Sequence, residues 1–333
     1  MSVASNIHFA TYPPMSSISS ILVLGAGELG TYVLHSLAQH PLRSQTTTIS
    51  VLLRESSINS NDESKAMRLV ALRNLGITFT SGDLVQDSED ELSSTFRNFD
   101  VVICCTGYMA ASGLQLKISR AVLSAGVPFY VPWQFGMDYE AIGRGYQQYM
   151  FDEQLNVRDL LRAQTGSNNT RWVALSTGLF SSVIFPPIGG LVDMEKRVVY
   201  GVGDWNRQFS TTTPEDIGKF TAELVLGPER DTLFAVNGPV YVAGDTVSYN
   251  DVAHIVEDVA GQSFTRRLLT LEETEHDMNT ELTAARICRN VLARGRGALF
   301  QDTDLWTPSA GLKVSSLDDF AKRYLPAFFV NPV

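Results

Sequence analysis

The run Gly25-Ala26-Gly27-Glu28-Leu29-Gly30 constrains the fold of this chain more than any other feature. It follows an apolar, β-type segment (19–24) and opens a helical segment (29–39). In a strand–turn–helix unit the first glycine allows a tight turn, the second lets backbone approach a diphosphate, and the third permits close helix–strand packing. The helix N-terminus adds free N–H groups and the positive end of a dipole. The motif therefore predicts a dinucleotide site, and a glycine-rich turn without a ligand is the alternative.

The chain up to residue 176 alternates short β-branched runs with helical segments. This pattern predicts an α/β fold with a doubly wound, Rossmann-type parallel sheet. We expect further strands at 49–53, 77–81, 100–104, 128–131 and 171–176, and helices at 63–75, 114–125 and 146–163.

The pattern loosens after Gly178, where Pro and Gly clusters predict loops at 186–190 and 201–206. A helix over 214–226 carries acidic residues in its first turn, and Ser248 is a plausible N-cap for a helix that reaches Ala260. We predict an NAD(P)-binding domain over 1–178, on which a helical segment (210–227) packs back, and a smaller, interleaved substrate-binding lobe over 179–333.

The formal net charge of the 333-residue chain is −10, which argues against nucleic acid as a partner. The three cysteines, Cys104, Cys105 and Cys288, lack CxxC spacing and indicate reduced intracellular thiols, with no zinc site. No apolar stretch approaches the roughly 20 residues that span a bilayer, and the N-terminus is a poor signal peptide. These features predict a cytoplasmic protein without a membrane partner, and no motif predicts an oligomeric state.

The end of the second predicted strand distinguishes the two nicotinamide dinucleotides. An NAD site usually places a carboxylate there, whereas an NADP site places cations around the 2′-phosphate. This chain has Arg54, followed by Glu55, and Lys65 in the next helix. We therefore favour NADPH, and a solvated Arg/Glu pair is the alternative. Thr106-Gly107, just past the fourth strand, should run beside the cofactor ribose.

Six blocks of sequence together resemble the isoflavone reductase-like, NmrA-like group of atypical short-chain dehydrogenases. The likeness runs from about residue 19 to 249 and is greatest for fungal secondary-metabolism members. The blocks are GAGELG (25–30), LLRESS (52–57), LGITFTSGDL (75–84), VPWQFGMD (131–138), FDEQLNVRDLLRA (151–163) and STGLF (176–180).

The resemblance implies that the protein binds NADPH, with Arg54 and Lys65 at the 2′-phosphate. It also implies that the loop of Trp133, Gln134 and Phe135 flanks the nicotinamide together with the STGLF turn. Members of the group reduce small aromatic or phenolic metabolites, and others of the same fold bind dinucleotide as regulators without turnover.

One departure from the group concerns catalysis. Plant reductases of the group carry a catalytic lysine where this chain has Gln154, and no lysine lies between Lys117 and Lys196. The Tyr-x-x-x-Lys dyad is also missing, and all five histidines lie outside 41–253.

Other side chains are therefore candidates for the chemistry. Tyr146 or Tyr149 could act as a general acid, and Asp152 or Glu153 could steady a cationic substrate. Gln154 could bind a carbonyl group or a water molecule, but it cannot deliver a proton as an ammonium group does. The two carboxylates could equally face solvent. The predicted substrate contacts are Trp133, Phe135, Tyr149 and Phe180, although the first two could instead be core aromatics.

The lack of the usual proton donors favours an imine, an iminium or an activated alkene over a plain ketone, because an iminium needs only hydride and a nearby negative charge. The sequence thus predicts an NADPH-dependent reductase of a small secondary metabolite. Two alternatives stay open, a dinucleotide-sensing regulator without turnover and an enzyme that keeps NADPH bound while it catalyses cyclisation or condensation.

Overall fold

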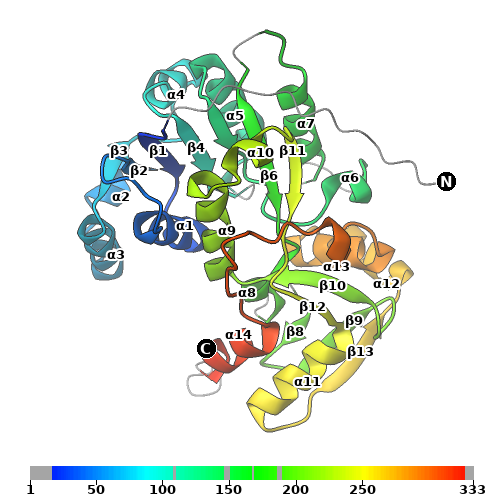
Figure 1. The fold of residues 1–333 in the computed structure, drawn as a ribbon. Helices are drawn as coiled ribbons and strands as arrows, with labels where there is room; N and C mark the ends of the chain where they lie inside the picture. Colours follow the sequence, from blue (N-terminus) through cyan, green and yellow to red (C-terminus); the bar gives the residue numbers. More distant parts are fainter. Residues whose placement is uncertain (1–16, 108–109, 146–150, 167–168, 186–189, 327–333) are drawn as a thin grey trace, which may run out of the picture.

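A seven-stranded parallel sheet forms the centre of the molecule (Figure 1). The computed structural model describes residues 17–107, 110–145, 151–166, 169–185 and 190–326. The strand order is β11-β6-β5-β4-β1-β2-β3, so the winding reverses between β1 and β4, where doubly wound sheets bind ligands beyond the strand ends. The strands are β1 (Ser20–Leu24), β2 (Thr48–Leu53), β3 (Ile77–Ser81), β4 (Val101–Cys104), β5 (Phe129–Val131), β6 (Arg171–Ser176) and β11 (Gly238–Tyr241).

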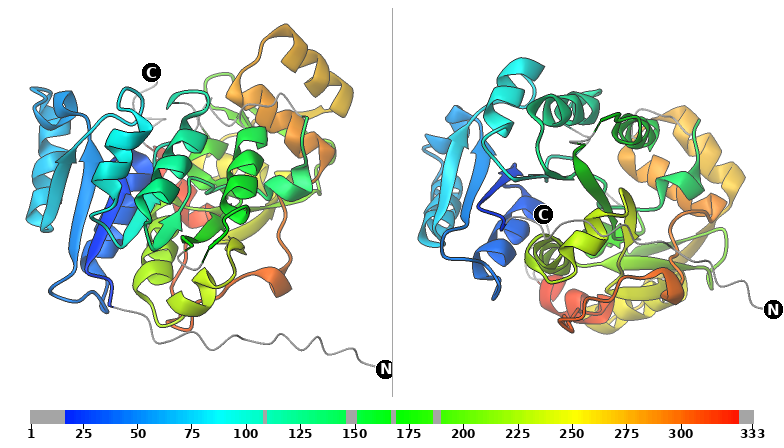
Figure 2. Two further views of the ribbon diagram at one scale, coloured as in Figure 1. Left: turned by 90° about the horizontal axis from the view of Figure 1, so that it is seen from above. Right: turned by 45° about the horizontal axis from the view of Figure 1, so that its top comes forward.

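Helices cover both faces of this sheet, because its strands are apolar on both sides (Figure 2). Ile21 and Val23 of β1 pack in one core cluster with α1 and α9. Leu22 and Leu24 point the other way, into a cluster with α4, α5 and α7. The helices of this part are α1 (Glu28–Gln39), α2 (Glu55–Ile58), α3 (Glu63–Asn74), α4 (Glu89–Phe96), α5 (Leu114–Ala125), α6 (Tyr139–Ile142), α7 (Phe151–Arg162), α9 (Pro214–Leu226) and α10 (Arg230–Phe234).

The sequence predicts most of these elements within one or two residues. The bounds of β3, β6, α5 and α9 match the expectation at both ends. The short helices α2 and α4 were not predicted, although Ser88 and Glu91 form a capping box at the start of α4. Part of the helix expected over 146–163 is present as α7, and 146–150 lie outside the described residues.

The C-terminal elements build a second layer of structure beside the main sheet (Figure 1). Its two small sheets have the orders β12-β10-β7 and β13-β9-β8. The loop expected over 201–206 is partly wrong, because Gly201 and Val202 complete β9. The elements are β7 (Leu179–Phe180), α8 (Ser181–Ile184), β8 (Val192–Asp193), β9 (Val198–Val202), β10 (Gln208–Thr212), β12 (Asp245–Ser248), α11 (Tyr249–Ala260), β13 (Thr265–Leu269), α12 (Leu271–Thr280), α13 (Ala284–Arg294), a 3-10 turn (Asp302–Asp304) and α14 (Leu317–Tyr324).

The two parts of the chain are interleaved, as predicted. β11 pairs with β6 at the edge of the main sheet, and α9 packs closely on α1. A Cβ atom on Gly218 would lie 2.7 Å from the backbone of Tyr32, so the glycine permits this close approach. The division at residue 178 stays a prediction, since the chain returns to the main sheet after it. In the described part of the chain, no helix is long and apolar enough to cross a membrane.

Candidate active site

The glycine loop between β1 and α1 has the geometry that its sequence predicts. Gly25 adopts a left-handed conformation (φ +93°), which makes the turn out of β1. A Cβ atom on Gly30 would lie 2.1 Å from the Gly25 carbonyl oxygen, so only glycine fits there. Gly27 is exposed and faces open space, and no side chain caps the helix that follows it. The first N–H groups of α1 are therefore accessible to an anion.

The next two residues of the loop are Glu28 and Leu29. Leu29 is buried in the core, so only its backbone could meet a ligand. The Glu28 carboxylate points toward the C-terminal part of the chain and accepts a hydrogen bond from the Ser182 hydroxyl group at 3.1 Å. Burial raises the pKa of Glu28, and the Ser182 hydrogen bond partly offsets this effect.

A cavity of about 510 Å³ lies beside the loop and extends to α3. Arg54, Lys65 and Arg68 line its far end, and all three side chains are exposed. None of them forms an ion pair with another described residue. Three exposed cations gathered at one cavity in a chain of net charge −10 give this region an affinity for an added phosphate group. The sequence singled out Arg54 and Lys65 but missed Arg68, which lies one helical turn after Lys65.

Thr106 and Gly107 lie where expected, beyond the end of β4. Thr106 lines the same cavity, and its hydroxyl group donates to the Leu24 carbonyl at 3.0 Å. A Cβ atom on Gly107 would lie 3.5 Å from the indole of Trp133, so the half-buried tryptophan stands against this strand end. The structure thus brings Trp133 beside the predicted cofactor loop.

Gln134 joins the loop after β5 to helix α7. Its side chain is fully buried, donates to the Gln154 carbonyl oxygen at 2.8 Å and accepts from the Arg158 guanidinium at 2.7 Å. Phe135 is also buried and packs in the main core, which supports the core interpretation of this aromatic. Phe180, in β7, packs at the edge of the same cluster and is half-buried.

Gln154 is fully buried, and neither polar atom of its side chain has a hydrogen-bond partner among the described residues. The hydroxyl groups of Ser176 and Thr177, at the end of β6, are also buried and have no hydrogen-bond partner among the described residues. An unsatisfied buried polar group costs about 1–3 kcal/mol, so a bound ligand or water that reaches it is stabilised. The backbone of Thr177 donates to the Gly136 carbonyl at 2.9 Å, which ties the β6 turn to the loop after β5.

The two carboxylates before Gln154 bind backbone amides. Asp152 is half-buried and accepts from the Gly145 amide at 3.1 Å. Glu153 is buried and accepts from the amides of Gly113, Gln115 and Leu116 at the start of α5, at 3.0, 2.7 and 3.3 Å. The interpretation of Glu153 as a solvent-facing carboxylate is therefore wrong, and its role in steadying a cationic substrate stays a prediction. Tyr146 and Tyr149 lie outside the described residues.

The model of the NmrA-like family matches residues 17–320, which is most of the chain. The chain belongs to the NmrA-like family. A relative from Gibberella moniliformis, an NmrA-like family domain-containing oxidoreductase, is 42% identical over 303 residues, which are 91% of this chain and 97% of the relative. The predicted resemblance to a fungal NmrA-like member is confirmed.

Solved structures of isoflavone reductase-like proteins share the fold of this NmrA-like chain. The crystal structure of an isoflavone reductase superposes with a TM-score of 0.72 at 20% identity and covers 92% of this chain and 100% of its own. The binary complex of leucoanthocyanidin reductase and NADPH from Vitis vinifera gives a TM-score of 0.71 at 17% identity, over 92% and 99% of the two chains. These likenesses confirm the predicted fold class.

Proposed function

We propose that this protein is an NADPH-dependent reductase of a small organic metabolite. The observation that carries the proposal is the cavity that runs from the uncapped N-terminus of α1 to the three cations Arg54, Lys65 and Arg68. The amides after Gly27 would hold the diphosphate, and the cations would hold the 2′-phosphate. Thr106 would lie along the ribose side of the same cavity. The NADPH complex of the leucoanthocyanidin reductase, a protein of this fold, supports the choice of cofactor.

When bound, NADPH supplies the hydride, and the protein contributes position, electrostatics and exclusion of water. Gln154 can orient a polar group of the substrate through its buried, unpartnered amide, but it has no proton to give at neutral pH. An imine, an iminium or an activated alkene therefore suits this site better than a ketone. Trp133 and Phe180 are half-buried and stay our predicted aromatic contacts, together with Tyr149.

Coenzyme selectivity tests the cofactor assignment. We expect the double variant Arg54→Gln/Lys65→Gln to bind NADPH at least about 100-fold more weakly, because the two lost charge-assisted contacts contribute about 1.5–3 kcal/mol each and 1.4 kcal/mol is a factor of ten. NADH affinity should change little, and the surface variant Lys196→Gln should bind both coenzymes as the parent does. Equal losses for NADPH and NADH would contradict the proposed role of these cations.

Turnover with matched panels of imines, activated alkenes and ketones tests the substrate class. Steady oxidation of NADPH with imines or activated alkenes is expected, and activity confined to ketones would overturn the assignment. Product formed without NADPH oxidation would instead indicate a cyclisation or condensation. We place the reaction in the cytoplasm, because all three cysteines are free thiols.

A second candidate function is dinucleotide sensing without turnover. The observation that favours it is Gln154, since an amide stands where the plant reductases have a catalytic lysine. Binding of NADPH without oxidation across all three substrate panels would support this second function.

A further inference from the structure

A second, smaller cavity of about 200 Å³ lies on the other side of the glycine loop. Its walls come from four elements that are far apart in sequence, the first turns of α1 and α9, the α8 turn and the end of α14. The residues that matter here are Glu28, Tyr32, Ser182, Phe185, Phe320 and Tyr324.

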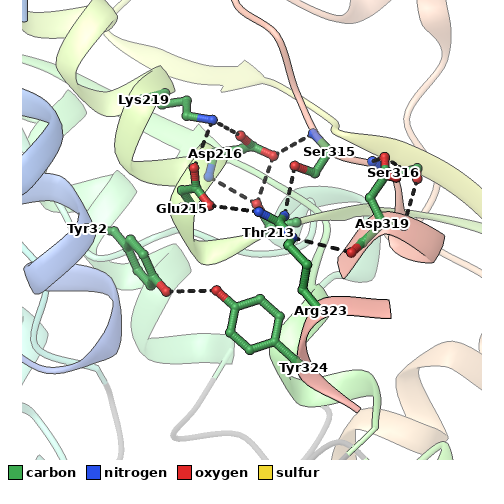
Figure 3. Close-up of polar contacts among 10 residues, drawn as sticks. All are labelled: Tyr32, Thr213, Glu215, Asp216, Lys219, Ser315, Ser316, Asp319, Arg323 and Tyr324. Carbon is green, nitrogen blue, oxygen red and sulfur yellow. Dashed lines mark hydrogen bonds and ion pairs between the residues drawn. The ribbon is translucent and has the colours of Figure 1, made fainter. Parts of the chain in front are cut away.

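The charges at one side of this cavity are already paired (Figure 3). Arg323 lies 3.4 Å from the Glu215 carboxylate, and Lys219 lies 3.2 Å from the same group. Glu28 differs from Glu215, because in the described part of the chain it forms no ion pair and accepts only the Ser182 hydrogen bond. The exposed carboxylate of Glu28 therefore lies at the cavity wall without an ion pair to another described residue.

Two tyrosine hydroxyl groups lie in the same space as Glu28. The Tyr32 and Tyr324 hydroxyl oxygens lie 3.2 Å apart, as Figure 3 shows. The pKa of Tyr32 is raised by burial, by its contacts with Tyr324, and by the negative charges of Glu215 and Glu28. A cation near these groups would be stabilised, and an anion would be repelled.

Three aromatic rings form another part of the wall. Phe185 and Phe320 are buried with their rings stacked at a centroid distance of 6.3 Å, and the Tyr324 ring stacks on Phe320 at 4.4 Å. An apolar cavity of about 150 Å³ suffices for a benzene ring. A space of about 200 Å³ thus has room for one ring and a short polar arm.

We propose that this cavity binds a small organic cation with one aromatic ring, a protonated amine or an iminium, and that Glu28 is its counter-ion. The ring would contact Phe185, Phe320 and Tyr324, and the charged nitrogen would approach Glu28 beside Ser182. The proposal goes beyond the reductase function, because binding here needs neither hydride transfer nor bound dinucleotide.

Calorimetric titration of the full chain with three single-ring probes of similar size tests the site. The probes are 2-phenylethylamine, 2-phenylethanol and 3-phenylpropionate, which are cationic, neutral and anionic at pH 7.5. We expect the amine to bind at least tenfold more tightly than the alcohol, and the anion to bind most weakly. Equal affinities, tightest binding of the anion, or no binding of the amine would overturn the proposal.

Two variants of Glu28 and one control locate the effect. Glu28→Gln should remove the preference for the amine, Glu28→Asp should keep it, and Glu89→Gln, on α4, should behave as the parent. Circular dichroism confirms that each variant is folded, and an amine preference that survives Glu28→Gln would contradict the assignment. A parallel titration of the parent protein with NADPH separates the two proposals. If the parent binds the amine but not NADPH, the reductase proposal is refuted and the amine-binding proposal stands.

Discussion

The buried carboxylate of Glu153 gives a prediction whose magnitude follows from its contacts. One oxygen accepts from the amides of Gln115 and Leu116, and the other accepts from Gly113. Replacement by Gln keeps one accepting oxygen and turns an NH₂ group toward an amide donor. At least one charge-assisted hydrogen bond, worth about 1.5–3 kcal/mol, is then lost. The favourable charge at the positive end of α5 is lost as well, at up to about 2 kcal/mol.

We therefore expect Glu153→Gln to lower the free energy of unfolding by about 3 kcal/mol. Urea denaturation followed by circular dichroism measures this loss. The matched control is Asp159→Asn, on the same helix, whose carboxylate is two-thirds exposed in a surface ion pair with Arg144 and should contribute less than about 1 kcal/mol. Similar effects of the two substitutions would refute the capping role of Glu153.

The hydrogen bonds of Glu153 at the start of α5 should also affect the predicted cofactor site. The Gln115 side chain donates to the Thr106 carbonyl at 2.8 Å, so a displaced α5 start would disturb a wall of the large cavity. We expect Glu153→Gln to weaken NADPH binding several-fold while Asp159→Asn leaves it unchanged.

Three further predictions concern the glycine loop and its neighbours. Gly30→Ala should destabilise the fold by about 1–3 kcal/mol, because its methyl group would overlap a backbone oxygen, and thermal unfolding measures it. Gly218→Ala should cost about 2 kcal/mol in the same assay, since it separates α9 from the backbone of Tyr32. Burial raises the pKa of Glu28, so its ionisation destabilises the folded state as the pH rises through that pKa. Glu28→Gln should therefore increase stability at pH 7.5 by less than about 1 kcal/mol, after allowance for solvent screening, and the gain should vanish near pH 3.5. A gain that persists at pH 3.5 would contradict this cause.

The Rossmann-type half could be predicted because its signals are local. The turn at Gly25, the left-handed helix end at Gly126 and the apolar strands are each readable within a few residues. Helix α4 was missed because its segment is short and mostly polar, although its capping box from Ser88 to Glu91 was readable.

The site was less predictable because its contacts join distant segments. Glu153 caps a helix that begins about 40 residues earlier, and no local pattern encodes that contact. Gln134 and Arg158 are likewise buried against each other across 24 residues. Sequence spacing identified the elements at the edge of the sheet. Tertiary packing determines which polar side chains there already have hydrogen-bond partners within the protein.

The account depends on a diphosphate bound by backbone amides at the start of α1, and Gly27→Ala tests this most directly. The parent glycine has φ −70° and open space around it, so alanine fits the folded chain and should leave the melting temperature unchanged. Its methyl group would lie where the diphosphate approaches, so NADPH affinity measured by fluorescence titration should fall at least tenfold. An unchanged NADPH affinity in a normally folded Gly27→Ala variant, or no NADPH binding by the parent, would contradict the account.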